Sequence, residues 1–214
     1  MHLRRRDRAC PTHTEPPMFN KLILTAALAL AAGQAFAAPV SYKIDPNHTN
    51  VIATWDHFGF SKPSAHFGKA DGTIVYDADN VGQSSVKVTL PLTGMTGFVA
   101  DFDEHLRSKD FFKTDEFPDA TFASTKVEAA GDNKLRVTGD LTLRGVTKPV
   151  VLDVTLNKAA AGRDGQPRIG FDAAATIKRS DFGLGLFAPK VSDEVALRIT
   201  TEAGVPKAEA APAK

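Results

Sequence analysis

Apolar and polar residues alternate over long stretches of this chain, and a period of two is typical of strands that bury one face. The alternation is clearest at residues 84–92, 134–144, 150–156 and 169–177. Less regular strands are predicted at 41–45, 51–60, 66–77, 121–129 and 195–199. Turns or loops rich in Gly, Pro, Asn, Asp or Ser are predicted at 61–64, 79–82, 145–149, 163–165 and 179–189.

This spacing predicts an all-β fold with about eight strands joined as consecutive hairpins. Helices do not alternate with the strands, so parallel βαβ architectures are excluded. The remaining choice lies between a sandwich and a barrel. Long consecutive strands favour a single antiparallel barrel, and Gly68 and Gly72 inside one strand are suited to the bends that closure needs.

One short helix is predicted at about residues 101–109. Asp101 is the expected N-cap, and Glu104 three residues later completes a capping box. Phe102 and Leu106 are four residues apart and share one face of the helix. As the single interruption in a run of strands, this helix is expected to lie near one mouth of the barrel.

The N-terminal 37 residues read as an extension and a signal peptide rather than as part of the fold. Residues 18–37 combine a short basic start, an apolar run and the cleavage pattern Ala35-Phe36-Ala37. Residues 1–17 do not suit a signal, so either translation starts at Met18 or the signal is an extended or twin-arginine type. The barrel domain is then expected at 38–203 and a disordered Ala/Pro-rich tail at 204–214.

Charge and cysteine content narrow the functional classes. The chain has 26 Lys and Arg against 25 Asp and Glu, and without residues 1–37 the acidic residues slightly outnumber the basic ones. Without a basic cluster, nucleic-acid binding is not expected. Cys10, the single cysteine, lies in the extension, so the barrel domain has neither disulfide nor thiol chemistry. No second apolar run is long enough to cross a bilayer, which predicts a soluble exported product.

Motifs of common catalytic and metal sites are not found, so we assign no catalytic and no metal-binding residues. His48, His57 and His66 recur at a nine-residue spacing, but an odd spacing reverses the face of a strand. Surface or hydrogen-bonding roles are therefore favoured over a metal site.

The inward faces also contain small residues, namely Gly139, Ala173 and Ala175. Small residues on an inner face either let bulky neighbours interdigitate or leave volume empty. Because the outer faces are polar, all apolar surface must meet in one interior, which makes an open volume more plausible here than in general.

Five ordered segments resemble the YceI-like family of bacterial periplasmic proteins. They are residues 42–48 (YKIDPNH), 105–112 (HLRSKDFF), 117–122 (FPDATF), 139–149 (GDLTLRGVTKP) and 179–184 (RSDFGL). The resemblance covers nearly all of residues 41–201 and implies a lipocalin-like antiparallel barrel. It also implies that a long polyisoprenoid ligand, such as an isoprenoid quinone, lies in a hydrophobic tunnel.

On this reading, core-lining and ligand-lining positions coincide. The helix residues His105 and Arg107 are candidates for a polar contact with the ligand head group, although a hydrogen bond that anchors the helix is an alternative. The complete set of candidate ligand-binding residues is Trp55, Phe58, Phe98, Phe102, His105, Leu106, Arg107, Phe111, Phe112, Phe117, Phe171 and Phe182.

The first functional hypothesis is therefore a non-enzymatic periplasmic carrier of an isoprenoid lipid. Its expected partners are the lipid and, transiently, a membrane; no covalent cofactor is expected, and the oligomeric state is left open, a dimer included. Two other classes stay open, a barrel enzyme such as a lipid isomerase or hydrolase, and a stress-response structural module without ligand.

Overall fold

The computed structural model describes residues 38–207; the N-terminal extension, the predicted signal peptide and residues 208–214 lie outside this part. Its strands are β1 (Val40–Ile44), β2 (Asn50–Thr54), β3 (Ser64–Phe67), β4 (Asp71–Tyr76), β5 (Ser85–Pro91), β6 (Asp119–Gly131), β7 (Lys134–Leu143), β8 (Val146–Ala161), β9 (Pro167–Lys178) and β10 (Glu194–Gly204). Its helical elements are α1 (Ala100–Arg107) and the short 3₁₀ turns η1 (Val81–Gln83) and η2 (Arg179–Phe182). In the described range, no helix has the length and apolar character needed to cross a membrane.

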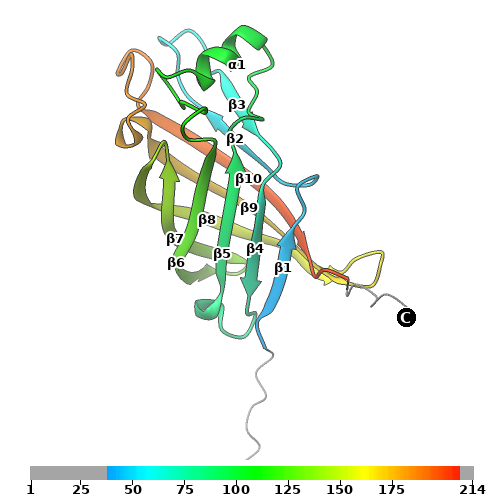
Figure 1. Ribbon diagram of the computed structural model, residues 1–214. Coiled ribbons are helices and arrows are strands. Elements are labelled where there is room, and N and C mark those ends of the chain that lie inside the picture. Colours follow the sequence, from blue (N-terminus) through cyan, green and yellow to red (C-terminus); the bar gives the residue numbers. More distant parts are fainter. Residues whose placement is uncertain (1–37, 208–214) are drawn as a thin grey trace, which may run out of the picture. The chain divides into compact units, whose positions relative to one another are not determined.

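Strand pairing joins eight antiparallel strands into a closed ring, and Figure 1 shows the barrel from the side. The order is β1, β4, β5, β6, β7, β8, β9 and β10, and β10 returns to β1 through Lys43 opposite Gly204 and Ile44 opposite Ala203. The predicted all-β barrel of about eight strands with one helix is confirmed. Eight strands enclose an interior that side chains can fill or that can hold one small ligand.

The remaining two strands, β2 and β3, extend the barrel at the end that carries α1 (Figure 1). Strand β10 pairs with β2 along Ala196–Thr200 and with β1 only at Ala203 and Gly204. Strands β1 and β2 therefore lie end to end along β10, and residues 45–49 connect them. Gly204, the first residue of the expected tail, belongs to β10 and pairs with both Lys43 and Arg168.

Two of the predicted strands were wrong in extent. The segment 66–77 is not one strand, because Lys69 has a left-handed φ of 58° and the chain turns there. The two halves join different neighbours: β3 pairs with β2, and β4 pairs with β1 and β5. The strand predicted at 51–60 stops at Thr54, and Phe58, with φ of 56°, lies in a loop.

The turn predicted at 145–149 was also too long. Arg144 and Gly145 both have positive φ, 51° and 74°, which matches a tight two-residue hairpin turn. Val146 then already pairs with Leu143, and β8 starts there. Pro149 is tolerated in this strand because only β7 pairs with it; the pairing with β9 begins at Asp153.

The capping box predicted for the helix does not form. The N-cap is Val99, which offers no side-chain hydrogen bond, and α1 runs over Ala100–Arg107. Instead, the Asp103 carboxylate accepts hydrogen bonds from the Thr96 hydroxyl at 2.9 Å and from the Gly97 backbone N–H at 2.5 Å. These bonds lower the pKa of Asp103, the bond from Gly97 contributing most. The acidic first turn thus fastens the helix to the preceding loop.

The buried side chains form two clusters along the barrel. The helix-end cluster includes Leu92, Met95, Leu106, Phe182 and Leu184. The far-end cluster includes Tyr42, Ile44, Val127, Ile169 and Phe171. Leu90, Phe122 and Leu152 are partly buried and pack against both clusters, so they mark the middle of the barrel.

Candidate functional site

A cavity of about 630 Å³ extends through the barrel interior, and its lining combines residues of both clusters. All ten strands contribute to its wall, which consists almost wholly of apolar side chains. Typical small-molecule sites occupy roughly 300–1,000 Å³ and are mainly apolar with a few polar groups. The interior is therefore a preformed site for an apolar ligand.

The small inward residues serve both of the purposes considered from the sequence. Ala173 lies on the cavity wall, so its short side chain leaves volume open there. At Gly139, by contrast, the Phe122 ring takes the space that a side chain would occupy, 2.4 Å from the position of a Cβ. The ring thereby packs closely against β7, where it also lines the cavity.

The helix end supplies five of the predicted ligand-binding residues to the wall. Phe102 and Leu106 on α1 both line the cavity, and Leu106 is buried. His105 lines it from the same helix, and its ring packs edge-on against Phe111 at 4.7 Å between centroids. Phe111 and Phe112 line it as well. The segment that follows the helix thus folds back over the barrel opening.

Three further predicted residues also line the cavity. Trp55 and Phe58 do so from the chain after β2, and Trp55 lies 6.1 Å from the Phe102 ring, centroid to centroid. Phe171 lines it from β9 in the far-end cluster. The predicted set therefore reaches from one end of the cavity to the other.

The other four predicted residues do not lie on the cavity wall. Phe98 faces outward and is 74% exposed. The Arg107 guanidinium donates to the Met95 carbonyl oxygen at 3.3 Å, which is the helix-anchoring role considered as its alternative. Phe117 packs against Gly145, and Phe182 is fully buried within the helix-end cluster.

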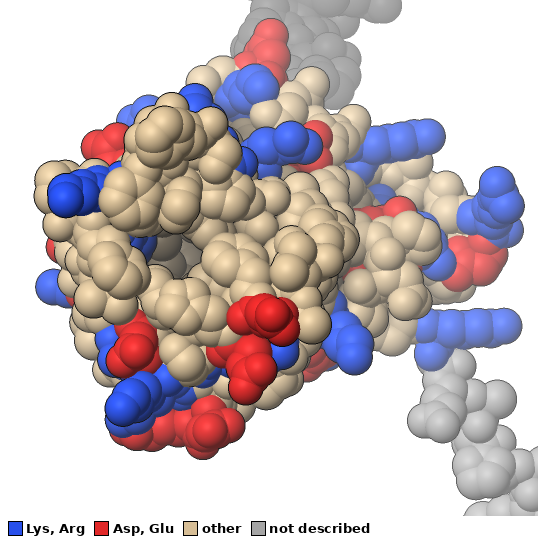
Figure 2. Space-filling model, turned by 90° about the horizontal axis from the view of Figure 1, so that it is seen from above, with Lys and Arg blue, Asp and Glu red and all other residues tan. Residues whose placement is uncertain are grey.

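We call the end that carries α1 the mouth, and loops 55–63, 92–99 and 183–193 surround it. His57, Leu186, Phe187 and Val191 line the cavity from two of these loops, and the sequence reasoning missed them. In Figure 2, which looks onto this end, a hollow opens among uncharged residues. A pattern of apolar residues between glycines at 182–187 was the available signal.

Arg179 lines the cavity and hydrogen-bonds to the mouth loop 183–193 from the inside. Its guanidinium donates to the carbonyl oxygens of Val191 and Ser192, both at 2.8 Å, and to that of Leu184. Burial lowers the pKa of the Arg179 guanidinium below its ordinary value. Three backbone carbonyls solvate the charge, so a buried cation can lie beside an apolar cavity and fix the loop over 183–193.

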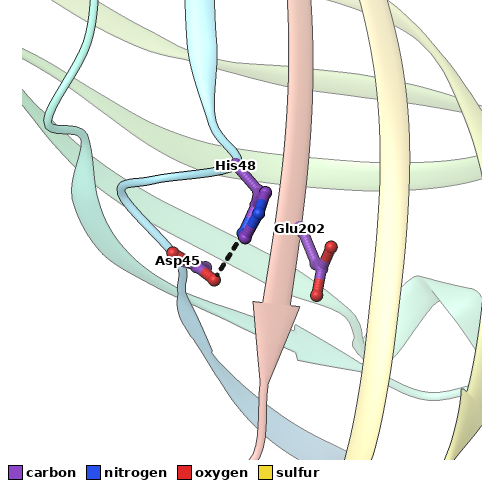
Figure 3. Close-up of side chains that lie close together, drawn as sticks. All are labelled: Asp45, His48 and Glu202. Carbon is purple, nitrogen blue, oxygen red and sulfur yellow. Dashed lines mark hydrogen bonds and ion pairs between the residues drawn. The ribbon is translucent and has the colours of Figure 1, made fainter. Parts of the chain in front are cut away.

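A second cluster of polar groups lies where β1, β2 and β10 meet, and Figure 3 shows it. Asp45 and His48 come from the connection between β1 and β2, and Glu202 comes from β10. His48 Nδ1 lies 2.8 Å from Asp45 Oδ2. This hydrogen bond is the main cause that raises the pKa of His48 and lowers the pKa of Asp45.

These three residues could each offer a metal ligand, since their ligand atoms all lie within 4.8 Å of one another. However, Arg168 donates to Glu202 Oε1 at 2.9 Å and to Asp164 at 3.3 Å. A bound cation would have to compete with this guanidinium. We therefore interpret the cluster as an ionic contact that joins the strand ends. The other two histidines of the nine-residue series lie elsewhere: His57 at the mouth, and His66 against the Phe98 ring.

Comparison with known proteins identifies relatives over almost the whole described range. The profile of the YceI-like domain matches residues 42–203. Protein YceI of Shigella flexneri is 41% identical over 179 residues, which are 83% of this chain and 92% of that protein.

Solved structures show the same architecture. The crystal structure of BcnA from Burkholderia cenocepacia matches with a TM-score of 0.69 at 27% identity, over 75% of this chain and 99% of BcnA. A polyisoprenoid binding domain from Saccharophagus degradans, implicated in plant cell wall breakdown, matches with a TM-score of 0.60 over 77% of this chain and 98% of that domain. At 13% identity, this second likeness shows the fold alone.

Proposed function

Because this chain belongs to the YceI-like family, we propose that its barrel binds a long isoprenoid lipid, of the isoprenoid-quinone or polyprenyl type, and carries it through the periplasm. The observation that carries this proposal is the apolar cavity of about 630 Å³, lined by both core clusters. A packed interior would have no room for such a ligand. The lining residues extend from the helix-end cluster to the far-end cluster, which suits an extended chain.

The energetics are compatible with reversible carriage. Burial from water stabilises by roughly 0.8 kcal/mol for each CH₂ group, so a tail of tens of carbons would exceed the limit of about 18–21 kcal/mol for non-covalent complexes. A lipid of this kind comes from a membrane, however, and not from water. Transfer between two apolar environments has a small net free energy, so the protein can both load and unload.

The chemistry of the wall favours binding over catalysis. The ionisable side chains that line the cavity are His57, Tyr76, His105 and Arg179. Three hydrogen bonds to backbone carbonyls already engage Arg179. The imidazoles lie at the mouth end, where a polar head group of the lipid would meet water.

Periplasmic location is part of the proposal. It rests on the signal-peptide features of residues 18–37, which lie outside the described part of the chain. Location is measured directly by fractionating cells of the native host and by sequencing the N-terminus of the purified protein.

The test of the ligand is mass spectrometry of lipids extracted from protein purified from its native periplasm. We expect an isoprenoid lipid in the extract from the wild type. Two adjacent alanines of β9 provide a matched pair of variants, since Ala173 lines the cavity and Ala174 is exposed on the outside. We expect Ala173→Phe to obstruct the cavity and lose the lipid, and Ala174→Phe to keep it.

The carrier proposal fails if no isoprenoid co-purifies and none binds on titration. It also fails if Ala173→Phe, folded as judged by circular dichroism, retains as much lipid as Ala174→Phe. In that case the lipid would lie outside the cavity.

A further inference from the structure

Large apolar side chains are exposed at the tips of the mouth loops. Phe60 is 91% exposed, Phe98 74% and Phe187 53%, and the three come from three different loops. Val99 and Leu186 beside them are also exposed. In the described part of the chain, few other large apolar side chains are comparably exposed. One of them is Val151, which lies on the wall of the barrel.

Each mouth loop contains one phenylalanine with a strained backbone, and two of these three are also among the exposed tips. Phe58, Phe98 and Phe187 have left-handed φ values of 56°, 69° and 65°, one in each mouth loop. Bulky residues seldom adopt this conformation, and strained backbone concentrates at functional sites. The surrounding structure maintains it: the Phe58 N–H donates to the Lys190 carbonyl oxygen at 2.9 Å, and the Phe98 N–H to the Thr96 hydroxyl at 2.9 Å.

The exposed aromatic residues are continuous with the cavity. Phe58 and Phe187 are both exposed and on the cavity wall, so the apolar surface runs from the loop tips into the barrel. In Figure 2 uncharged residues surround the hollow, and charged side chains gather farther out. A lipid that passes through this opening would meet water unless another apolar phase lies against the loops.

Lysines stand next to two of the tips. Lys62 follows Phe60 by two residues and Lys190 follows Phe187 by three, and both are exposed. Exposed phenylalanines with lysines beside two of them are typical of proteins that lie on a membrane surface. Asp101 and Glu104 of α1 are exposed at the same end, so the attraction to anionic lipids is confined to the two lysine-bearing loops. These side chains lie on separate loops around the opening of the cavity, an arrangement that suits insertion into a bilayer from which the lipid is taken up.

We propose that the mouth docks on a lipid bilayer, with Phe60, Phe98 and Phe187 inserted into the interface and Lys62 and Lys190 against anionic head groups. This inference rests on the proposed function, because it assigns the route by which the ligand enters and leaves. Docking places the opening of the cavity directly over the acyl chains, so the lipid never crosses water.

The test is co-sedimentation of the protein with vesicles of phosphatidylethanolamine and phosphatidylglycerol. We expect the wild type to bind, and the triple variant Phe60→Ser/Phe98→Ser/Phe187→Ser to bind at least roughly tenfold more weakly. Val151→Ser is the matched control, since Val151 is 47% exposed but lies on β8, away from the mouth. We expect this control to bind like the wild type. Should the triple variant not fold, Phe60→Ser alone tests the same point.

Three results would overturn the docking proposal. The first is a wild type that does not sediment with the vesicles at low salt. The second is equal loss of binding in the triple variant and in Val151→Ser. The third is a dimer in gel filtration that the triple variant abolishes while vesicle binding persists, which would make a second copy of the chain the occupant of this surface.

A second measurement separates this proposal from the carrier function. Geranylgeraniol is offered to the protein either from a cyclodextrin complex or from vesicles. Uptake from cyclodextrin without vesicle binding would overturn docking and leave the carrier function intact. Vesicle binding that depends on the three phenylalanines, without uptake of geranylgeraniol from either source, would support docking and contradict the carrier function. We expect uptake from both sources in the wild type, and uptake from cyclodextrin alone in the triple variant.

Discussion

The connection between β1 and β2 lies against β10, where the Asp45 N–H donates to the Glu202 carbonyl oxygen at 2.8 Å, and polar side chains fix its shape. Asp45 caps the turn between them by accepting a hydrogen bond from the Asn47 N–H at 2.9 Å, and its other oxygen binds His48. Glu202 and Arg168 add a salt bridge at 2.9 Å on the neighbouring strands. The closing contact between β1 and β10 has only two paired residues on each strand. These side chains therefore stabilise the place where the ring of strands is weakest.

The contact between Asp45 and His48 predicts a pH dependence of stability. The raised pKa of His48 gives a contribution that is complete below its ordinary value of 6.5 and is lost as pH rises through the folded value. The lowered pKa of Asp45 gives a contribution that is present above 3.8 and is lost as pH falls through the folded value. Replacing His48 by Gln should therefore lower the free energy of unfolding most at about pH 5, and least in alkaline solution.

Urea unfolding of the wild type and His48→Gln across this pH range measures the difference. Asp45→Asn and the double variant complete a cycle that isolates the pair. The double variant should lose little more than either single variant does. A difference between wild type and His48→Gln that stays constant with pH would show that the charges of the pair do not act.

Residue identity alone could not tell which aromatic side chains face the cavity. Phe98 and Phe102 are four residues apart and of one type, yet one is exposed and the other lines the interior. Phe98 lies in the loop before the helix and has left-handed backbone, whereas Phe102 lies on α1 and lines the cavity. Conversely, Val86, Val88 and Leu152 line the cavity, and their alternation was visible in the sequence. Strand alternation was therefore a better guide to the wall than aromatic type.

Among the elements, local pattern predicted strands well wherever alternation continued without a break. It failed at 66–77, where Gly68 and Gly72 were interpreted as bends inside one strand although they flank the turn at Lys69, and at the helix start. There, Asp101 and Glu104 match a capping box, but Thr96 and Gly97 provide donors that Asp103 binds instead. Tertiary contacts thus overrode a local rule. Position along the chain still placed the helix correctly, over the opening of the barrel.

Helix α1 is expected to retain the ligand rather than only to brace the barrel. Phe102 and Leu106 line the cavity, so each substitution of the double variant Phe102→Ser/Leu106→Ser should lower the free energy of unfolding by about 2–5 kcal/mol, typical of a lost core side chain. The variant should still fold and should lose most of its bound isoprenoid. Lipid content per protein, measured by mass spectrometry beside urea unfolding, separates the two effects.

The matched control is Asp101→Ser/Glu104→Ser, which changes two exposed positions of the same helix. It should keep its lipid. If the double cavity variant is too unstable, Phe102→Ser alone makes the same comparison. If the folded cavity variant keeps the lipid content of the wild type, α1 braces the barrel and does not retain the ligand.

At the scale of the whole molecule, the sequence predicted the class of fold but not how the ring closes. Closure depends on β1 meeting β10, residues about 160 positions apart, and such a pairing leaves no local pattern. The addition of β2 and β3 beyond the ring was equally hidden, because it depends on β10 changing its partner between Thr200 and Ala203. The mouth owes its shape to both features.

A barrel with an open interior should depend on its ligand for stability. A ligand that binds only the folded state at a hundred times its Kd adds about 2.7 kcal/mol to the free energy of unfolding. For a chain of this size, that shift corresponds to a rise of roughly 5–10 °C in Tm. We therefore expect delipidated protein to melt lower, and added geranylgeraniol to restore Tm in a concentration-dependent manner.

Ala173→Phe should be the informative comparison, since its ring would project into the cavity and obstruct an extended lipid. Its Tm should not respond to geranylgeraniol, while that of Ala174→Phe should rise like the wild type. A Tm of the wild type that does not change across the titration would contradict a ligand inside the barrel.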